Sequence, residues 1–139
     1  MSEVAIDNRR AWQTAHWRSI ISCYNRSPWF EYFRDELNRL YEMEFELLID
    51  WNLACMNWVL QKIGLDIPVS VTENWKDTYD PKEFNDWRNK LLPRTIHSVP
   101  GQPTYGQVFM DRTGFLPHLS ILDLLFCEGK NSSEILKQQ

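Results

Sequence analysis

The chain has 139 residues, 43% of them hydrophobic and 14% aromatic, with seven tryptophans and a formal net charge of -4. This length suits one domain that buries about two-thirds of its unfolded surface, so we expect a single domain over residues 1–139. Because acidic and basic residues are interspersed, the composition argues against a nucleic-acid-binding surface.

The cysteines indicate a reducing compartment. The chain has three cysteines, an odd number, at Cys23, Cys55 and Cys127. They lie far apart, and each belongs to an apolar segment with helical spacing, which is typical of cytosolic proteins. The N-terminal residues lack the apolar run of a signal peptide, and no window approaches the roughly 18 apolar residues of a membrane span. We therefore predict a cytoplasmic protein with no membrane span. No metal-ligand array or cofactor motif is present in the sequence, so we expect neither a metal nor a cofactor.

A first helix is predicted over residues 9–24, where apolar residues recur with helical spacing. His16 falls on one of its two apolar faces and Tyr24 on the other, so both side chains are expected to point inward. We interpret His16 first as a core histidine with hydrogen-bonded ring nitrogens; the alternative is a general base or substrate contact. Before this helix, residues 3–7 alternate and could form a short strand.

Two further helices are expected. Ser27 and Pro28 suit an N-cap and first helical turn, which would begin the second helix. The third is predicted over residues 44–63 and ended by Gly64; apolar residues on two of its faces make it the expected central, buried helix. Asn52 lies in its main apolar stripe, where an unpaired amide would cost about 1–3 kcal/mol. We interpret Asn52 as part of a structural network, with ligand contact as the alternative.

Residues 67–72 alternate apolar and polar side chains, which predicts a strand, and Pro68 confines it to a sheet edge or a strand start. The polar tract that follows contains Trp75, Tyr79, Phe84 and Trp87. Packed on the third helix, this tract would be core, whereas an exposed cluster of several hundred Å² would mark a partner surface. The expected fold class is mainly α, with minor strands at the periphery of a compact multi-helix domain.

The most specific pattern lies in residues 105–129. Ser120 and Asp123 precede an apolar run in the pattern of a capping box, in which each side chain accepts a backbone amide of the helix start. We favour this structural interpretation over a catalytic pair. The following residues are apolar on nearly every side, so the short helix is expected to insert into the core.

Polar and aromatic residues close to this helix are candidates for ligand binding. Tyr105, Gln107 and His118 lie near a glycine and a proline-rich loop, a setting in which rigid scaffolds often carry binding residues. A Ser-His-Asp triad can be assembled from Ser120, His118 and Asp123. Their crowding within a few residues argues against triad geometry.

Three segments together resemble a known family. Residues 115–129 read Phe-Leu-Pro-His-Leu-Ser-Ile-Leu-Asp-Leu-Leu-Phe-Cys-Glu-Gly, after Tyr-Gly-Gln-Val-Phe, and residues 12–32 carry a spaced Trp, His, Tyr, Pro, Phe and Tyr pattern. With Glu-Phe-Glu-Leu-Leu-Ile-Asp-Trp-Asn at residues 44–52, they resemble the WbqC-like proteins over essentially the whole chain. Family members usually begin with a further segment that carries a Tyr-Leu-Pro element. The chain therefore resembles an N-terminally truncated member.

The resemblance implies a cytoplasmic bacterial protein with a role in surface-polysaccharide or O-antigen biosynthesis, but it supplies no established reaction. Our first hypothesis is a sugar-modifying transferase that acts on an activated sugar. The catalytic candidates are His16, Tyr24 and Asn52, and the ligand-binding candidates are Tyr105, Gln107 and His118. The alternative is a non-catalytic scaffold or protein-interaction module, favoured because no nucleophile, metal or phosphate motif occurs.

Self-association is also expected. A central helix with two apolar faces needs more cover than the other predicted elements supply, and a symmetric homo-oligomer can bury the same patch on each subunit. The expected contacts are the end from Val4 to Ile6 and an exposed stripe of the first or third helix.

Overall fold

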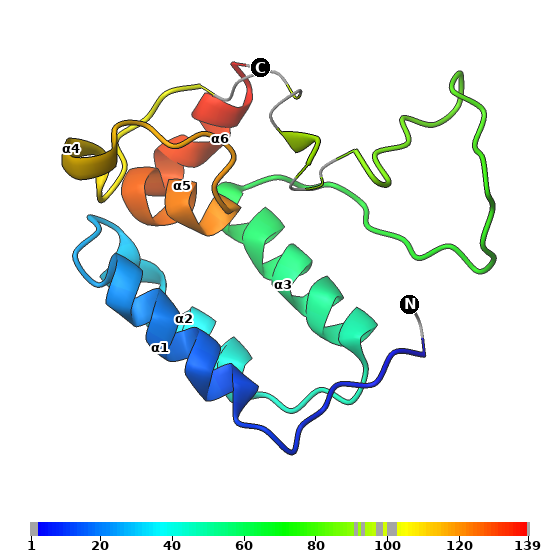
Figure 1. Ribbon diagram of the computed structural model, residues 1–139, viewed down its shortest axis with the longest axis horizontal. Coiled ribbons are helices and arrows are strands. Elements are labelled where there is room, and N and C mark those ends of the chain that lie inside the picture. Colours follow the sequence, from blue (N-terminus) through cyan, green and yellow to red (C-terminus); the bar gives the residue numbers. More distant parts are fainter. Residues whose placement is uncertain (1–2, 91, 93, 97–98, 100–102, 139) are drawn as a thin grey trace.

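The computed structural model describes residues 3–90, 92, 94–96, 99 and 103–138. It is mainly helical, which confirms the predicted class. The elements in chain order are α1 (Trp12–Tyr24), α2 (Phe30–Glu42), α3 (Leu48–Ile63), α4 (Met110–Thr113), α5 (Ile121–Glu128), the 3-10 helix η2 (Gly129–Asn131) and α6 (Ser132–Leu136). Figure 1 shows α1 and α2 together on one side, α3 on the other, and α5 with α6 across one end.

Local signals locate most of the helices but not all of their starts. Gly64 ends α3 in the left-handed conformation at φ 71°, as its position predicts. The N-cap predicted at Ser27 is wrong, because α2 begins at Phe30. Ser27 is buried instead and its hydroxyl donates a hydrogen bond to the Tyr24 carbonyl at 2.7 Å, which closes the turn between α1 and α2.

The predicted minor strands do not form among the described residues. Near the N-terminus, Ala5 and Leu47 make one isolated antiparallel bridge. Residues 67–72, the other predicted strand, adopt neither helix nor strand. Alternation alone does not make a strand, because a β-segment becomes stable only when neighbouring strands pair with its backbone.

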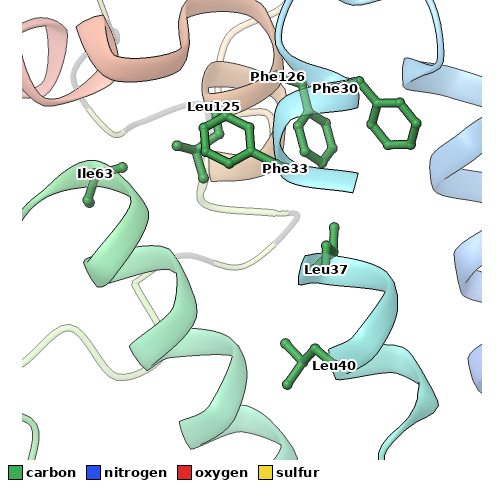
Figure 2. Close-up of a cluster of buried hydrophobic side chains, with 7 residues drawn as sticks. All are labelled: Phe30, Phe33, Leu37, Leu40, Ile63, Leu125 and Phe126. Carbon is green, nitrogen blue, oxygen red and sulfur yellow. The ribbon is translucent and has the colours of Figure 1, made fainter. Parts of the chain in front are cut away.

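The core forms where α2, α3 and α5 meet. Figure 2 shows its buried side chains, which are Phe30, Phe33, Leu37 and Leu40 from α2, Ile63 from α3, and Leu125 and Phe126 from α5. The ring of Phe126 lies edge-on to Phe30, with 5.2 Å between centroids, a favourable aromatic geometry. Helix α5 therefore inserts into the core as predicted.

The central, buried helix is α5 and not, as the sequence predicted, α3. Among the residues of α3, Ile63 alone is buried, whereas Leu125 and Phe126 of α5 are 0% exposed. One apolar flank of α3 reaches the core with Trp51, Ala54 and Trp58. The rest of α3 remains partly or fully exposed, so α5 is the helix around which the others pack.

Residues 65–90 form an arm that leaves the end of α3 and extends beyond the helices (Figure 1), and residues 70–75 of the arm line a shallow hollow with Ile49 and Leu53 of α3. Its large aromatic residues are exposed, with Trp75 at 75%, Phe84 at 52% and Trp87 at 50%. The Arg88 guanidinium lies 4.7 Å from the ring centroid of Trp75 and the same distance from that of Tyr79. The arm is thus organised by its own residues and not by the helical core.

Candidate functional site

His16 lies on the exposed side of α1, so the prediction that it points inward is wrong. Its ring is edge-on to Trp12, with 5.3 Å between centroids. The core instead takes the other apolar face of α1, which carries Trp17, Ile21 and Tyr24. Both faces have helical periodicity, and the face that carries Trp17, Ile21 and Tyr24 is the one that packs, half-buried, against the core.

Asn52 is exposed on α3, which also contradicts its predicted place in a covered stripe. The three catalytic candidates do not form one site. Tyr24 follows His16 by eight residues along α1, a rise of about 12 Å, and it packs against the core residue Phe126. An exposed histidine and a half-buried tyrosine at that separation cannot act on the same small group.

Buried polar residues gather where the ends of α1 and α5 meet Tyr105. The Tyr105 hydroxyl donates a hydrogen bond of 2.8 Å to the carboxylate of Asp123, which is only 3% exposed. Burial, and then the nearby Asp123 charge, raises the pKa of Tyr24. Burial likewise raises the pKa of Tyr105. Both phenols therefore stay protonated well above neutral pH, and the Tyr105 hydroxyl remains a hydrogen-bond donor to Asp123.

Of the two residues predicted to form a capping box, only Ser120 caps the helix, and Asp123 bonds elsewhere. Ser120 is the N-cap of α5, and its Oγ accepts a hydrogen bond from the Leu122 amide at 3.3 Å. The Asp123 carboxylate accepts from Tyr105. The sequence pattern predicted that the Asp123 carboxylate would cap the start of α5, but it bonds instead to Tyr105, which is distant in sequence.

Gln107 closes the loop that carries α4. Its Nε2 donates to the Leu116 carbonyl and its Oε1 accepts from the Leu116 amide, each at 2.8 Å. Both ends of this side-chain amide are therefore used within the loop. His118, the third predicted ligand-binding residue, is half-buried and has a φ of 61°, which is uncommon for a residue other than glycine.

Segments distant in sequence meet around a hollow of about 610 Å³, which we call the arginine hollow. Arg26 and Pro28 come from the turn between α1 and α2, Gly106 and Arg112 from the loop around α4, and Glu128 from the end of α5. Neither arginine forms an ion pair with any residue that the structure describes. The segments at residues 12–32 and 105–129, which carry much of the family resemblance, both contribute to the hollow.

The carboxylates of Asp111 and Glu128 and the thiol of Cys127 also line the hollow. The Glu128 carboxylate accepts from the Gly106 amide at 3.4 Å and from the Asn131 side chain at 3.3 Å. Burial raises the pKa of the Cys127 thiol to about 11, so this lining residue is not a thiolate near neutral pH. The hollow therefore holds two arginines without an ion pair to any described residue, beside two carboxylates, and its one thiol is not activated.

Sequence reasoning missed Arg26 and Arg112. Arg26 lies between two predicted helices, and Arg112 lies in α4, a short helix that the sequence did not predict. No spacing rule joins two arginines that far apart in the chain. Within the described ranges, no three His, Cys, Asp or Glu side chains gather as a metal site would require.

The fold and the hollow define a small, mainly helical protein with a polar surface site next to its C-terminal core helix. The model of the WbqC-like protein family matches residues 1–91, more than half of the chain, and the chain belongs to that family. The match includes the segments at residues 12–32 and 44–52 and ends before residues 105–129. No curated protein and no solved structure matches the chain. None of the described helices is both long and apolar enough to cross a membrane.

Proposed function

We propose that the chain binds a small anionic molecule of the activated-sugar class in the arginine hollow, as a cytoplasmic component of bacterial surface-polysaccharide biosynthesis. The observation that carries the proposal is the pair of guanidinium groups, Arg26 and Arg112, that line one hollow without an ion pair to any described residue. The resemblance to WbqC-like proteins supports the choice of pathway.

The chemistry of the hollow suits such a ligand. Activated sugars carry phosphate groups, and the planar guanidinium matches phosphate oxygens with paired hydrogen-bond donors. Pro28, Val108 and Phe109 add an apolar wall against which a sugar or a base can pack. The volume of about 610 Å³ lies within the range typical of small-molecule sites, roughly 300–1,000 Å³.

A transfer reaction is the further step of this proposal. The Cys127 thiol, with its raised pKa of about 11, is a poor nucleophile at neutral pH. His16 is exposed on α1, and neither it nor Asn52 is among the residues that line the hollow. The proposal therefore rests on ligand binding. For the chain to act as a sugar-modifying transferase, the two arginines would have to position the activated-sugar donor.

Calorimetry with UDP-glucose, UDP and inorganic phosphate tests the site. We expect UDP and UDP-glucose to bind the wild type, and the double variant Arg26→Gln, Arg112→Gln to bind them at least tenfold more weakly. The matched control is Arg18→Gln, an exposed arginine of α1 outside the hollow. Absence of binding to the wild type, or an equal loss in the control, would contradict the proposal.

A protein-interaction module is the second candidate, favoured by the exposed aromatic residues of the arm. Trp75 and Trp87 are 75% and 50% exposed. Aromatic side chains are enriched at protein interfaces, where they supply much of the contact area. Pull-downs should lose specific partners with Trp75→Ala and Trp87→Ala but keep them with Tyr32→Ala, an exposed aromatic outside the arm. An unchanged set of partners would remove this candidate.

A further inference from the structure

Residues 67–72, at the start of the arm, have the pattern of a strand without a partner strand. Ile67, Val69 and Val71 are 53%, 43% and 53% exposed, although Ile67 and Val71 each line a shallow hollow beside α3. No backbone amide or carbonyl of residues 67–72 is hydrogen-bonded to another part of the described chain. An extended segment with free backbone groups and a row of exposed apolar side chains is a template for pairing with another chain.

We infer that residues 67–72 pair with the same residues of a second copy of this chain, as an antiparallel two-stranded ribbon. In an extended segment the backbone groups of successive residues point to opposite edges. Pro68 has no amide, which interrupts the edge formed by residues 68, 70 and 72. The edge formed by Ile67, Val69 and Val71 keeps every donor and acceptor, so pairing takes place there.

The order of the side chains favours a second copy over an unrelated strand. A two-fold axis at Val69 places Val69 opposite its own counterpart and Ile67 opposite Val71, so that every apolar residue meets an apolar residue. Each of these pairs exchanges two backbone hydrogen bonds, and side chains directly opposite each other contact across the strands. The symmetry is that of an isologous dimer, in which one surface serves both subunits.

Charges at the ends of the segment agree with this register. No charged residue lies between Ile67 and Thr72. With the axis at Val69, the flanking acids fall opposite neutral residues, Asp66 opposite Thr72 and Glu73 opposite Leu65. Like charges directly opposite each other would destabilise the pair, and this register avoids them.

The inferred contact differs from the association expected through the N-terminal end. There Ala5 already pairs with Leu47, and the amides of Ile6 and Leu48 already donate to Glu46 and Val4 at 2.8 and 2.9 Å. That edge is therefore partly used within the chain. The backbone groups of residues 67–72 are not used within the described chain. The inference holds whether or not the arginine hollow binds an activated sugar.

Light scattering on the whole chain tests the inference with two proline variants. The wild type should give about twice the mass of 16.7 kDa at tens of micromolar. Val69→Pro removes the central amide of the pairing edge and should weaken dimerisation at least tenfold. Ser70→Pro removes an amide of the opposite edge, which Pro68 already interrupts, and should leave the dimer intact.

Amide hydrogen exchange supplies a second readout that does not depend on a variant. In the wild type the amides of Val69 and Val71 should become protected as concentration rises, while that of Ser70 stays unprotected. A monomeric wild type would overturn the inference and leave the edge to an extended segment of another protein. Equal masses for Val69→Pro and Ser70→Pro, with unchanged melting of both, would also overturn it, because association would then use another surface.

Discussion

Helix α5 and the arm both carry large apolar residues, yet they occupy opposite environments. Leu124, Leu125 and Phe126 of α5 are 5%, 0% and 0% exposed, whereas Trp75 and Phe84 of the arm are 75% and 52% exposed. The difference lies in what surrounds each segment. Helix α5 contacts both α2 and α3, while the arm turns its rings toward one another and toward Arg88. Residue type alone therefore does not determine burial; a neighbouring element with a complementary apolar face is also needed.

Polar contacts replace packing in the arm. Arg88 forms an ion pair with Asp86 at 2.7 Å and donates to the carbonyls of Lys76 and Asp77 at 2.8 and 3.2 Å. Hydrogen bonds from the Arg88 side chain lower the pKa of Asp86 to about 2. These contacts join residues close in sequence and add little to the stability of the helices, because exposed ion pairs are weak.

The same substitution in both regions gives the largest contrast. Phe126→Ala should lower the free energy of unfolding by about 3–5 kcal/mol, because it leaves a cavity among Phe30, Phe33 and Leu125. Phe84→Ala in the arm should change it by less than about 0.5 kcal/mol. Urea denaturation measures both values. A cost above about 2 kcal/mol for Phe84→Ala would show that the arm packs on the core.

Two glycines with positive φ compare a crowded position next to the core with an open one just before the arm. Gly129 has a φ of 56°, and a Cβ at that position would collide with the Trp29 indole. Gly129→Ala should therefore cost about 2–4 kcal/mol, since backbone strain and overpacking add. Gly64 has a φ of 71° but open space around it, so Gly64→Ala should cost only about 1–2 kcal/mol. Equal losses in urea denaturation would mean that the contact with Trp29 is unimportant.

The buried carboxylate provides a third test. Tyr105→Phe keeps the ring but removes the donor to Asp123, and the cost should be about 1–3 kcal/mol. Tyr79→Phe in the arm is the matched control, because Tyr79 contacts Phe84 and Arg88 through its ring, and it should be nearly neutral. Melting temperatures of both variants measure the effect. A neutral Tyr105→Phe would show that the hydrogen bond has an adequate substitute.

Alkaline pH should weaken the core. The pKa of Cys127 is about 11 in the fold, against an ordinary value of 9.0, so the folded chain holds this proton more tightly. The stabilisation is complete below about pH 9 and is lost as pH rises toward 11, by about 1–3 kcal/mol. Denaturation at pH 8 and pH 10.5 should show a smaller decrease for Cys127→Ala than for the wild type. The exposed Cys23, replaced by alanine, should leave the decrease unchanged.

The smallest effect is expected at the start of α5. Ser120→Ala removes the N-cap and should lower stability by about 0.5–2 kcal/mol. The measured quantity is the melting temperature, compared with that of Ser133→Ala, a half-buried serine that is not a helix cap. Unchanged melting combined with lost binding of UDP-glucose would assign Ser120 to the ligand and not to the helix.

Sequence periodicity predicted the helices and the insertion of α5, because both depend on residues near one another in the chain. It did not predict which of two apolar faces of α1 is buried, so His16 was placed inward wrongly. The same ambiguity misplaced Asn52. Strand patterns were misleading at residues 67–72 because alternation does not say whether a partner strand exists.

The candidate site was predictable only in part. Tyr105 and Asp123 stood out individually, but their hydrogen bond spans 18 positions and follows from the way α5 packs. Arg26 and Arg112 carry no local signal, and they meet only because α4 lies beside the turn between α1 and α2. Local rules find residues with unusual chemistry; tertiary packing decides which of them share a site.

The contact between α2 and α5 forms late in synthesis, because α5 lies near the end of the chain. The Trp29 amide donates to the Phe126 carbonyl at 2.9 Å, although the arm and the loop around α4 separate the two helices in sequence. During synthesis, at about 5–20 residues per second, α1 and α3 can cover part of α2 first, but the part that contacts Phe126 stays uncovered for several seconds until α5 emerges. Loop-closure entropy grows slowly, by about 0.6 kcal/mol per doubling of length. An insertion in the arm should therefore change equilibrium stability little, but it would lengthen the delay before α5 can pack on α2 during synthesis.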